Sequence, residues 1–122
     1  MLTFTRNMAP HVNKELALAI DARRANNAAL EFKHLENAHV LGQESTLLHT
    51  KVHCLMLVWG LRHGNVREIC GQVFRIIGAA TKTAIGLVPS GNTGGSNISP
   101  FAKLPLSPQH AQTITAAHAA DK

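Results

Sequence analysis

Tyrosine is absent from this 122-residue chain, and aromatic residues together make up only 4% of it. Strands draw on aromatic and β-branched side chains, so this scarcity, beside frequent Ala and Leu, favours helices. Two cysteines, Cys54 and Cys70, are too few for a disulfide framework. Each lies in an apolar helical pattern, where a free cysteine usually packs as a small hydrophobic residue. The composition therefore predicts an all-α protein without disulfides.

Long hydrophobic runs are also missing. No stretch approaches the ~18–20 apolar residues of a membrane span. The first ten residues, MLTFTRNMAP, lack the basic region and apolar core of a signal peptide. We therefore expect a soluble, cytoplasmic protein without a membrane partner.

Acidic residues are few: seven against twelve Lys and Arg, which gives a formal charge of +5. Such a charge raises the question of whether the protein binds nucleic acid. The basic residues are scattered from Arg6 to Lys122, however, with no basic run and no stripe interleaved with aromatics. We expect a mildly basic, solvated surface and no nucleic-acid partner.

The chain length suits one domain with one core. Residues 1–10 are predicted to be an irregular N-terminal segment, and Pro10 is predicted to mark the start of a helix. Four main helices are predicted, at about residues 12–24, 28–41, 45–63 and 66–80. They form two antiparallel hairpins with short turns, a plan like that of tetratricopeptide-type pairs.

The amino-acid composition changes after Gly86. Residues 86–100 are rich in Gly, Pro, Asn and Ser, which excludes a helix or an ordinary strand. We expect an ordered loop that folds back over the helices, so that residues 1–104 form one helical domain. Residues 105–122 are expected to be a loosely ordered tail.

Histidine and glutamate concentrate in one stretch, from Glu31 to His53. It contains two E-x-x-H motifs and one H-x-x-x-H motif, spacings that put side chains on one face of a helix. Helical-wheel positions place His49 and His53 opposite the polar side of their helix, on the side of Gly60, whose lack of a side chain allows a neighbouring helix to approach. The candidate metal ligands are His34, His39, His49, His53, Glu31 and Glu36.

Two E-x-x-H motifs on one helix cannot serve a dinuclear centre in the way that di-iron bundles use them. A mononuclear site of two or three histidines and one glutamate fits better. His49 and His53 are the firmest ligands, with His39 or His34 third and Glu31 or Glu36 fourth. Such a site suits Zn, Cu, Ni or Fe, and the sequence leaves the transition metal open.

Several of these motifs together resemble a small bacterial family known only as domain of unknown function 3703. They are HLENAHVLGQ at His34–Gln43, H-x-x-x-H-x-x-M-L at His49–Leu57, G-Q-x-x-R at Gly71–Arg75 and GNTGGSN at Gly91–Asn97. The resemblance covers about residues 15–105 and implies no established activity.

The function that we predict is metal binding between the second and third helices, in metal handling or sensing. One alternative is a metal-dependent enzyme that uses the same cluster, with a pocket lined by residues 86–100 and Gln43 or Gln72. Another is an interaction module whose histidines and glutamates form a structural core network. Abundant apolar residues in the third and fourth helices also suggest a homodimer, because four short helices are too few to bury all of them.

Overall fold

The computed structural model describes residues 2–82 and 105–119, which form five α-helices and no strand. The all-α prediction is confirmed, with one helix more than the four predicted. The helices are α1 (Leu2–Arg24), α2 (Ala28–Gly42), α3 (Thr46–Arg62), α4 (Val66–Lys82) and α5 (Pro108–Ala119). The predicted loop at residues 86–100 lies outside the described residues.

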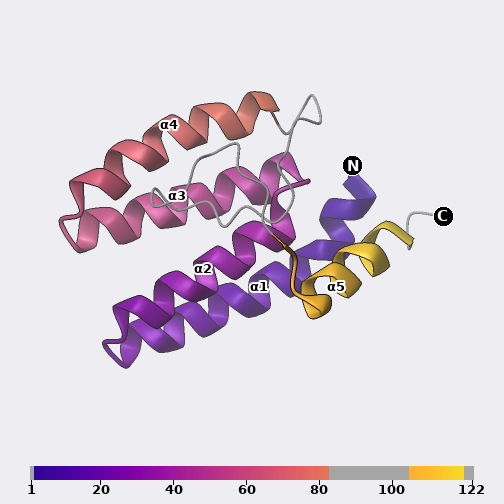
Figure 1. Ribbon diagram of the computed structural model, residues 1–122, viewed down its shortest axis with the longest axis horizontal. Helices are drawn as coiled ribbons and strands as arrows, with labels where there is room; N and C mark the ends of the chain where they lie inside the picture. The colour runs from indigo at the N-terminus through magenta and orange to yellow at the C-terminus, as the bar shows by residue number, and fades with distance from the viewer. Residues whose placement is uncertain (1, 83–104, 120–122) are drawn as a thin grey trace.

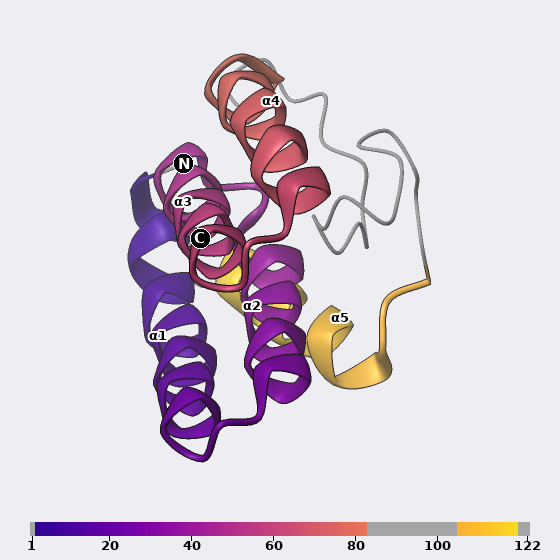
Figure 2. The same ribbon diagram turned by 90° about the vertical axis from the view of Figure 1, so that its left-hand side faces the viewer.

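The first four helices follow one another through short turns. Helix α1 packs most extensively on α2, and α3 on α4, while α2 and α3 join the two pairs (Figures 1 and 2). Asn27, Ser45 and Asn65 directly precede α2, α3 and α4. The side chain of each accepts a hydrogen bond from a backbone N–H three residues on and so caps the helix. The closer analogy with tetratricopeptide pairs stays a prediction.

The prediction that residues 1–10 form an irregular N-terminal segment is wrong, because α1 already begins at Leu2. Phe4, Met8 and Val12 recur every four residues, and all three are at most 1% exposed. Their burial stabilises the helix through Pro10, which lacks the N–H that would bond the carbonyl of Arg6. The helix changes direction in its indigo N-terminal part (Figure 1).

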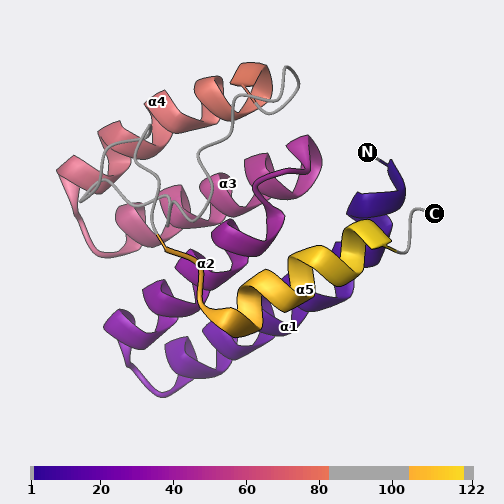
Figure 3. The ribbon, with the colours of Figure 1, turned by 45° about the vertical axis from the view of Figure 1, so that its right-hand side comes forward.

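Helix α5 lies along α1 and also contacts α2 (Figure 3). It places Ala117 in the core. The carbonyl of Ala117 accepts a hydrogen bond from Asn7 Nδ2 at 3.2 Å, and the rings of Phe4 and His118 stack 4.4 Å apart. These contacts hold the two ends of the fold together, although a domain boundary near residue 104 stays a prediction.

Met8→Ala tests whether the N-terminal part of α1 belongs to the core. Met8 is fully buried, so we expect the free energy of unfolding to fall by about 2–5 kcal/mol. Ile20→Ala on the same helix, half exposed, should cost under about 1 kcal/mol. Urea denaturation measures both values. Equal small losses would show that residues before Pro10 do not contribute to the core.

Candidate metal centre

A tight turn joins α2 to α3 and sets the geometry of the site. Only residues 43–45 separate the two helices. Gly42, the last residue of α2, lies so close to α3 that an added Cβ would be 3.0 Å from Leu48 Cβ. Ser45 is fully buried, and its hydroxyl lies 2.6 Å from that of Thr5. This turn brings the last turn of α2 beside the first two turns of α3.

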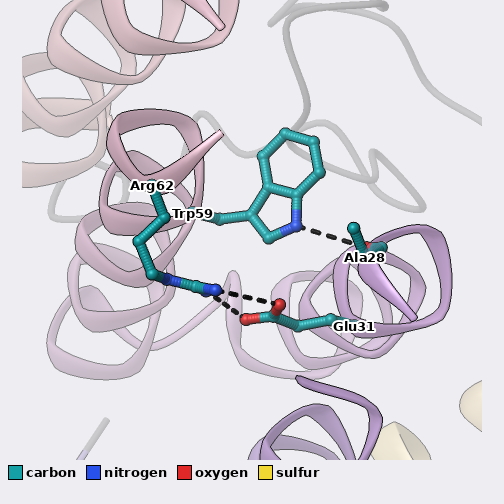
Figure 4. Close-up of polar contacts among 4 residues, drawn as sticks. All are labelled: Ala28, Glu31, Trp59 and Arg62. Carbon is teal, nitrogen blue, oxygen red and sulfur yellow. Dashed lines mark hydrogen bonds and ion pairs between the residues drawn. The ribbon is translucent and has the colours of Figure 1, made fainter. Parts of the chain in front are cut away.

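The opposite ends of α2 and α3 are joined by two side chains of α3 (Figure 4). Trp59 Nε1 donates a hydrogen bond to the carbonyl of Ala28 at 3.2 Å. The guanidinium of Arg62 faces the carboxylate of Glu31 through both of its terminal nitrogens. The two helices therefore contact each other at both ends, on either side of the space between them.

Three histidines meet in this space. His39 comes from the end of α2, and His49 and His53 come from successive turns of α3. Their Nε2 atoms form a nearly equilateral triangle, with separations of 2.9 Å for His39–His49 and 3.0 Å for the other two pairs. The three side chains are 2%, 8% and 2% exposed, in chain order. Among the described residues, they are the group whose ligand atoms could surround one metal ion.

Burial keeps two of these imidazoles, those of His49 and His53, neutral. It lowers the pKa of His49 from 6.5 to about 3, and the neighbouring His53 adds to the effect. Burial also lowers the pKa of His53, to about 4, reinforced by the charge of Arg75 and opposed by the hydrogen bond to Gln72. A neutral imidazole keeps the lone pair that a metal requires.

Helix α4 supplies a further layer of polar side chains. His53 Nδ1 lies 2.6 Å from Gln72 Oε1, and Gln72 Nε2 donates to Glu68 Oε2, also at 2.6 Å. Burial lowers the pKa of the nearby Arg75, and the charge of Glu68 opposes that shift. Gly60 permits this approach, because an added Cβ would meet Glu68 Cβ at 3.3 Å. The predicted close approach at Gly60 is confirmed.

The other three predicted ligands have different surroundings. His34 Nδ1 lies 2.7 Å from Glu15 Oε2, on α1. Glu31 pairs with Arg62, at the far end of α2 from His39. Glu36 is half-buried. The structure thus brings together three of the six candidate residues.

Sequence reasoning missed Glu68 and Arg75 and considered Gln72 only as a pocket residue. A signal was present: the three residues recur at spacings of four and three, which places them on one face of α4. An amphipathic helix is usually expected to bury its apolar side, and α4 instead turns this polar side inward.

The fold and site together define an all-helical protein with a buried tri-histidine cluster. The family described as "protein of unknown function" (DUF3703) matches residues 6–114, so the chain belongs to that family. Comparisons with curated proteins and with solved structures find no match. The helices that the structure describes include none long and apolar enough to cross a membrane.

The lowered pKa values predict a dependence of stability on pH. Below about pH 6.5 the unfolded chain binds protons at His49 and His53, whereas in the folded protein these histidines stay unprotonated down to about pH 3 and pH 4, respectively. The contribution of these two histidines to the free energy of unfolding is therefore fully present above pH 6.5. It declines as the pH falls, by about 2 kcal/mol per histidine at pH 5.

Urea denaturation in a chelating buffer at pH 7 and pH 5 measures this decline. The unfolding midpoint should fall at pH 5, and a His49→Gln/His53→Gln variant should lose less stability over the same interval. An equal loss in both proteins would contradict the assignment to these two histidines.

Proposed function

We propose that the protein binds one transition-metal ion through His39, His49 and His53, in metal handling or sensing. The observation that carries this proposal is the triangle of Nε2 atoms. Each atom carries either a hydrogen or a lone pair, so at least two of the three are alike. At least one contact at 2.9–3.0 Å therefore sets lone pair against lone pair or hydrogen against hydrogen, whatever the tautomers.

A cation at the centre removes this conflict, because it accepts all three lone pairs. With metal–nitrogen bonds of about 2.0–2.1 Å, ligands at right angles lie about 2.8–3.0 Å apart, and tetrahedral ones about 3.3–3.4 Å. The observed triangle fits three neighbouring positions of an octahedron as it stands, and a tetrahedral ion after a widening of a few tenths of an ångström. Zn, Cu, Ni and Fe(II) all accept imidazole ligands.

The same conflict weighs against a purely structural histidine network, because hydrogen bonds alone would leave at least one of the three contacts repulsive. A metal-dependent enzyme needs a cavity that reaches the ion. A cleft of about 400 Å³ lies between α1, α2 and α3, and its lining includes Leu16, Lys51 and Arg62 but none of the three histidines. The pocket that the enzyme alternative predicts includes residues 86–100, which lie outside the described residues, so the metal-dependent enzyme stays the alternative proposal.

Metal analysis of untagged protein tests the proposal. We expect about one ion per chain after expression in rich medium or reconstitution with Zn, Cu, Ni or Fe(II). His49→Ala/His53→Ala should lose it, whereas His11→Ala, at an exposed position on α1, should keep it. Circular dichroism checks that each variant is folded. Wild-type protein that stays metal-free after reconstitution would overturn the proposal.

The homodimer predicted from the sequence remains a proposal, as do the cytoplasmic location and the absence of a nucleic-acid partner. Support for the dimer comes from α4, whose outer side exposes Val66, Val73, Phe74 and Ile77 by 48–69%. Such a patch is typical of a contact surface.

Light scattering after size-exclusion chromatography measures the mass. We expect a dimer that Phe74→Glu converts to a monomer, because a charge there cannot be buried against apolar side chains. Leu47→Glu, on the exposed side of α3, should leave the mass unchanged. A monomeric wild type would refute the dimer.

A further inference from the structure

The polar side of α4 contributes none of the three ligands, yet it faces the cluster. Glu68, Gln72 and Arg75 are 7%, 0% and 7% exposed. Burying three polar side chains costs desolvation free energy, and the outer side of the same helix is apolar. This inverted placement indicates that the polar side chains serve a function. One of them, Gln72, is hydrogen-bonded directly to His53, which is one of the three proposed ligands.

The orientation of the Gln72 amide follows from its two contacts. A carboxylate only accepts hydrogen bonds, so the amide NH₂ must face Glu68 Oε2, 2.6 Å away. The amide oxygen is then directed at His53 Nδ1, also at 2.6 Å. Because an amide oxygen cannot donate, this nitrogen of His53 must carry the hydrogen.

A neutral imidazole with its hydrogen on Nδ1 has its lone pair on Nε2. That is the atom of His53 which lies 3.0 Å from the Nε2 atoms of both His39 and His49. Glu68 therefore acts on the cluster through two hydrogen bonds, one to Gln72 and one from Gln72 to His53.

We propose that Gln72 and Glu68 are positioning residues that hold His53 in the tautomer required for metal binding. This inference deepens the proposed function and rests on it. Partners of this kind, which bond the second nitrogen of a ligating histidine, fix the orientation of the ring and raise its affinity for the ion. Helix α4 is thus a part of the metal site, although it supplies none of the three ligands.

Two variants separate positioning from packing. Gln72→Leu keeps approximate size and removes the acceptor, so metal affinity should fall about ten- to a hundredfold. The exchange Glu68→Gln/Gln72→Glu keeps the net charge and rebuilds the chain in reverse, since the new carboxylate at position 72 would accept from both His53 Nδ1–H and the new amide at position 68. Its affinity should return to within a few-fold of wild type. Gln112→Leu, at an exposed site on α5, is the matched control.

The tautomer itself is read from ¹⁵N chemical shifts of the His53 ring in metal-free protein. Wild type and the exchange variant should carry the hydrogen on Nδ1, whereas Gln72→Leu should show a mixture. A wild-type His53 protonated on Nε2 would overturn the inference, as would an exchange variant that binds no better than Gln72→Leu. If Gln72→Leu fails to fold, the His53 tautomer and the metal affinity of the wild type and the exchange variant still test the inference.

This readout keeps the two proposals distinguishable. Wild-type protein that binds no metal while His53 carries its hydrogen on Nδ1 would refute metal binding and retain the hydrogen-bonded chain. Metal binding with unchanged affinity and tautomer in Gln72→Leu would refute the role of α4 and retain the site.

Discussion

Three buried imidazoles whose Nε2 atoms meet at one point are the constraint on which the rest of the structure depends. Their mutual contacts at 2.9–3.0 Å cannot all be hydrogen bonds. Such a cluster persists only if the surrounding helices hold it rigidly, or if an ion satisfies the lone pairs. Contacts at both ends of α2 and α3 hold these helices together around the cluster, and the proposed ion would relieve the remaining conflict.

Each neighbouring element contributes to holding this cluster. The three-residue turn joins α2 to α3 beside the histidines, and the contacts of Trp59 and Arg62 fix the far ends of the same helices. Helix α4 approaches across Gly60 and directs Gln72 at His53. Ordering side chains in advance lowers the entropic cost of binding, which suits a site for a small ion.

Periodicity explains why much of the fold could be predicted. The last three of the four helices expected from the sequence start or end within two residues of the observed bounds, because Asn27, Ser45 and Asn65 cap them and Gly64 lies in a turn. The start of α1 was missed because Pro10 was interpreted as a boundary. The repeated apolar positions Phe4, Met8 and Val12 outweigh the hydrogen bond that proline removes.

The sequence by itself determined the helical class and the clustering of His and Glu between residues 31 and 53, because both follow from local spacing. It also indicated that His49 and His53 lie on the inner side of one helix. Only the tertiary structure decided which candidates meet. His39 and His34 are five residues apart on one helix, yet one faces α3 and the other pairs with Glu15 on α1. The neighbour that each face of a helix meets depends on packing between distant segments, and local spacing carries no information about it.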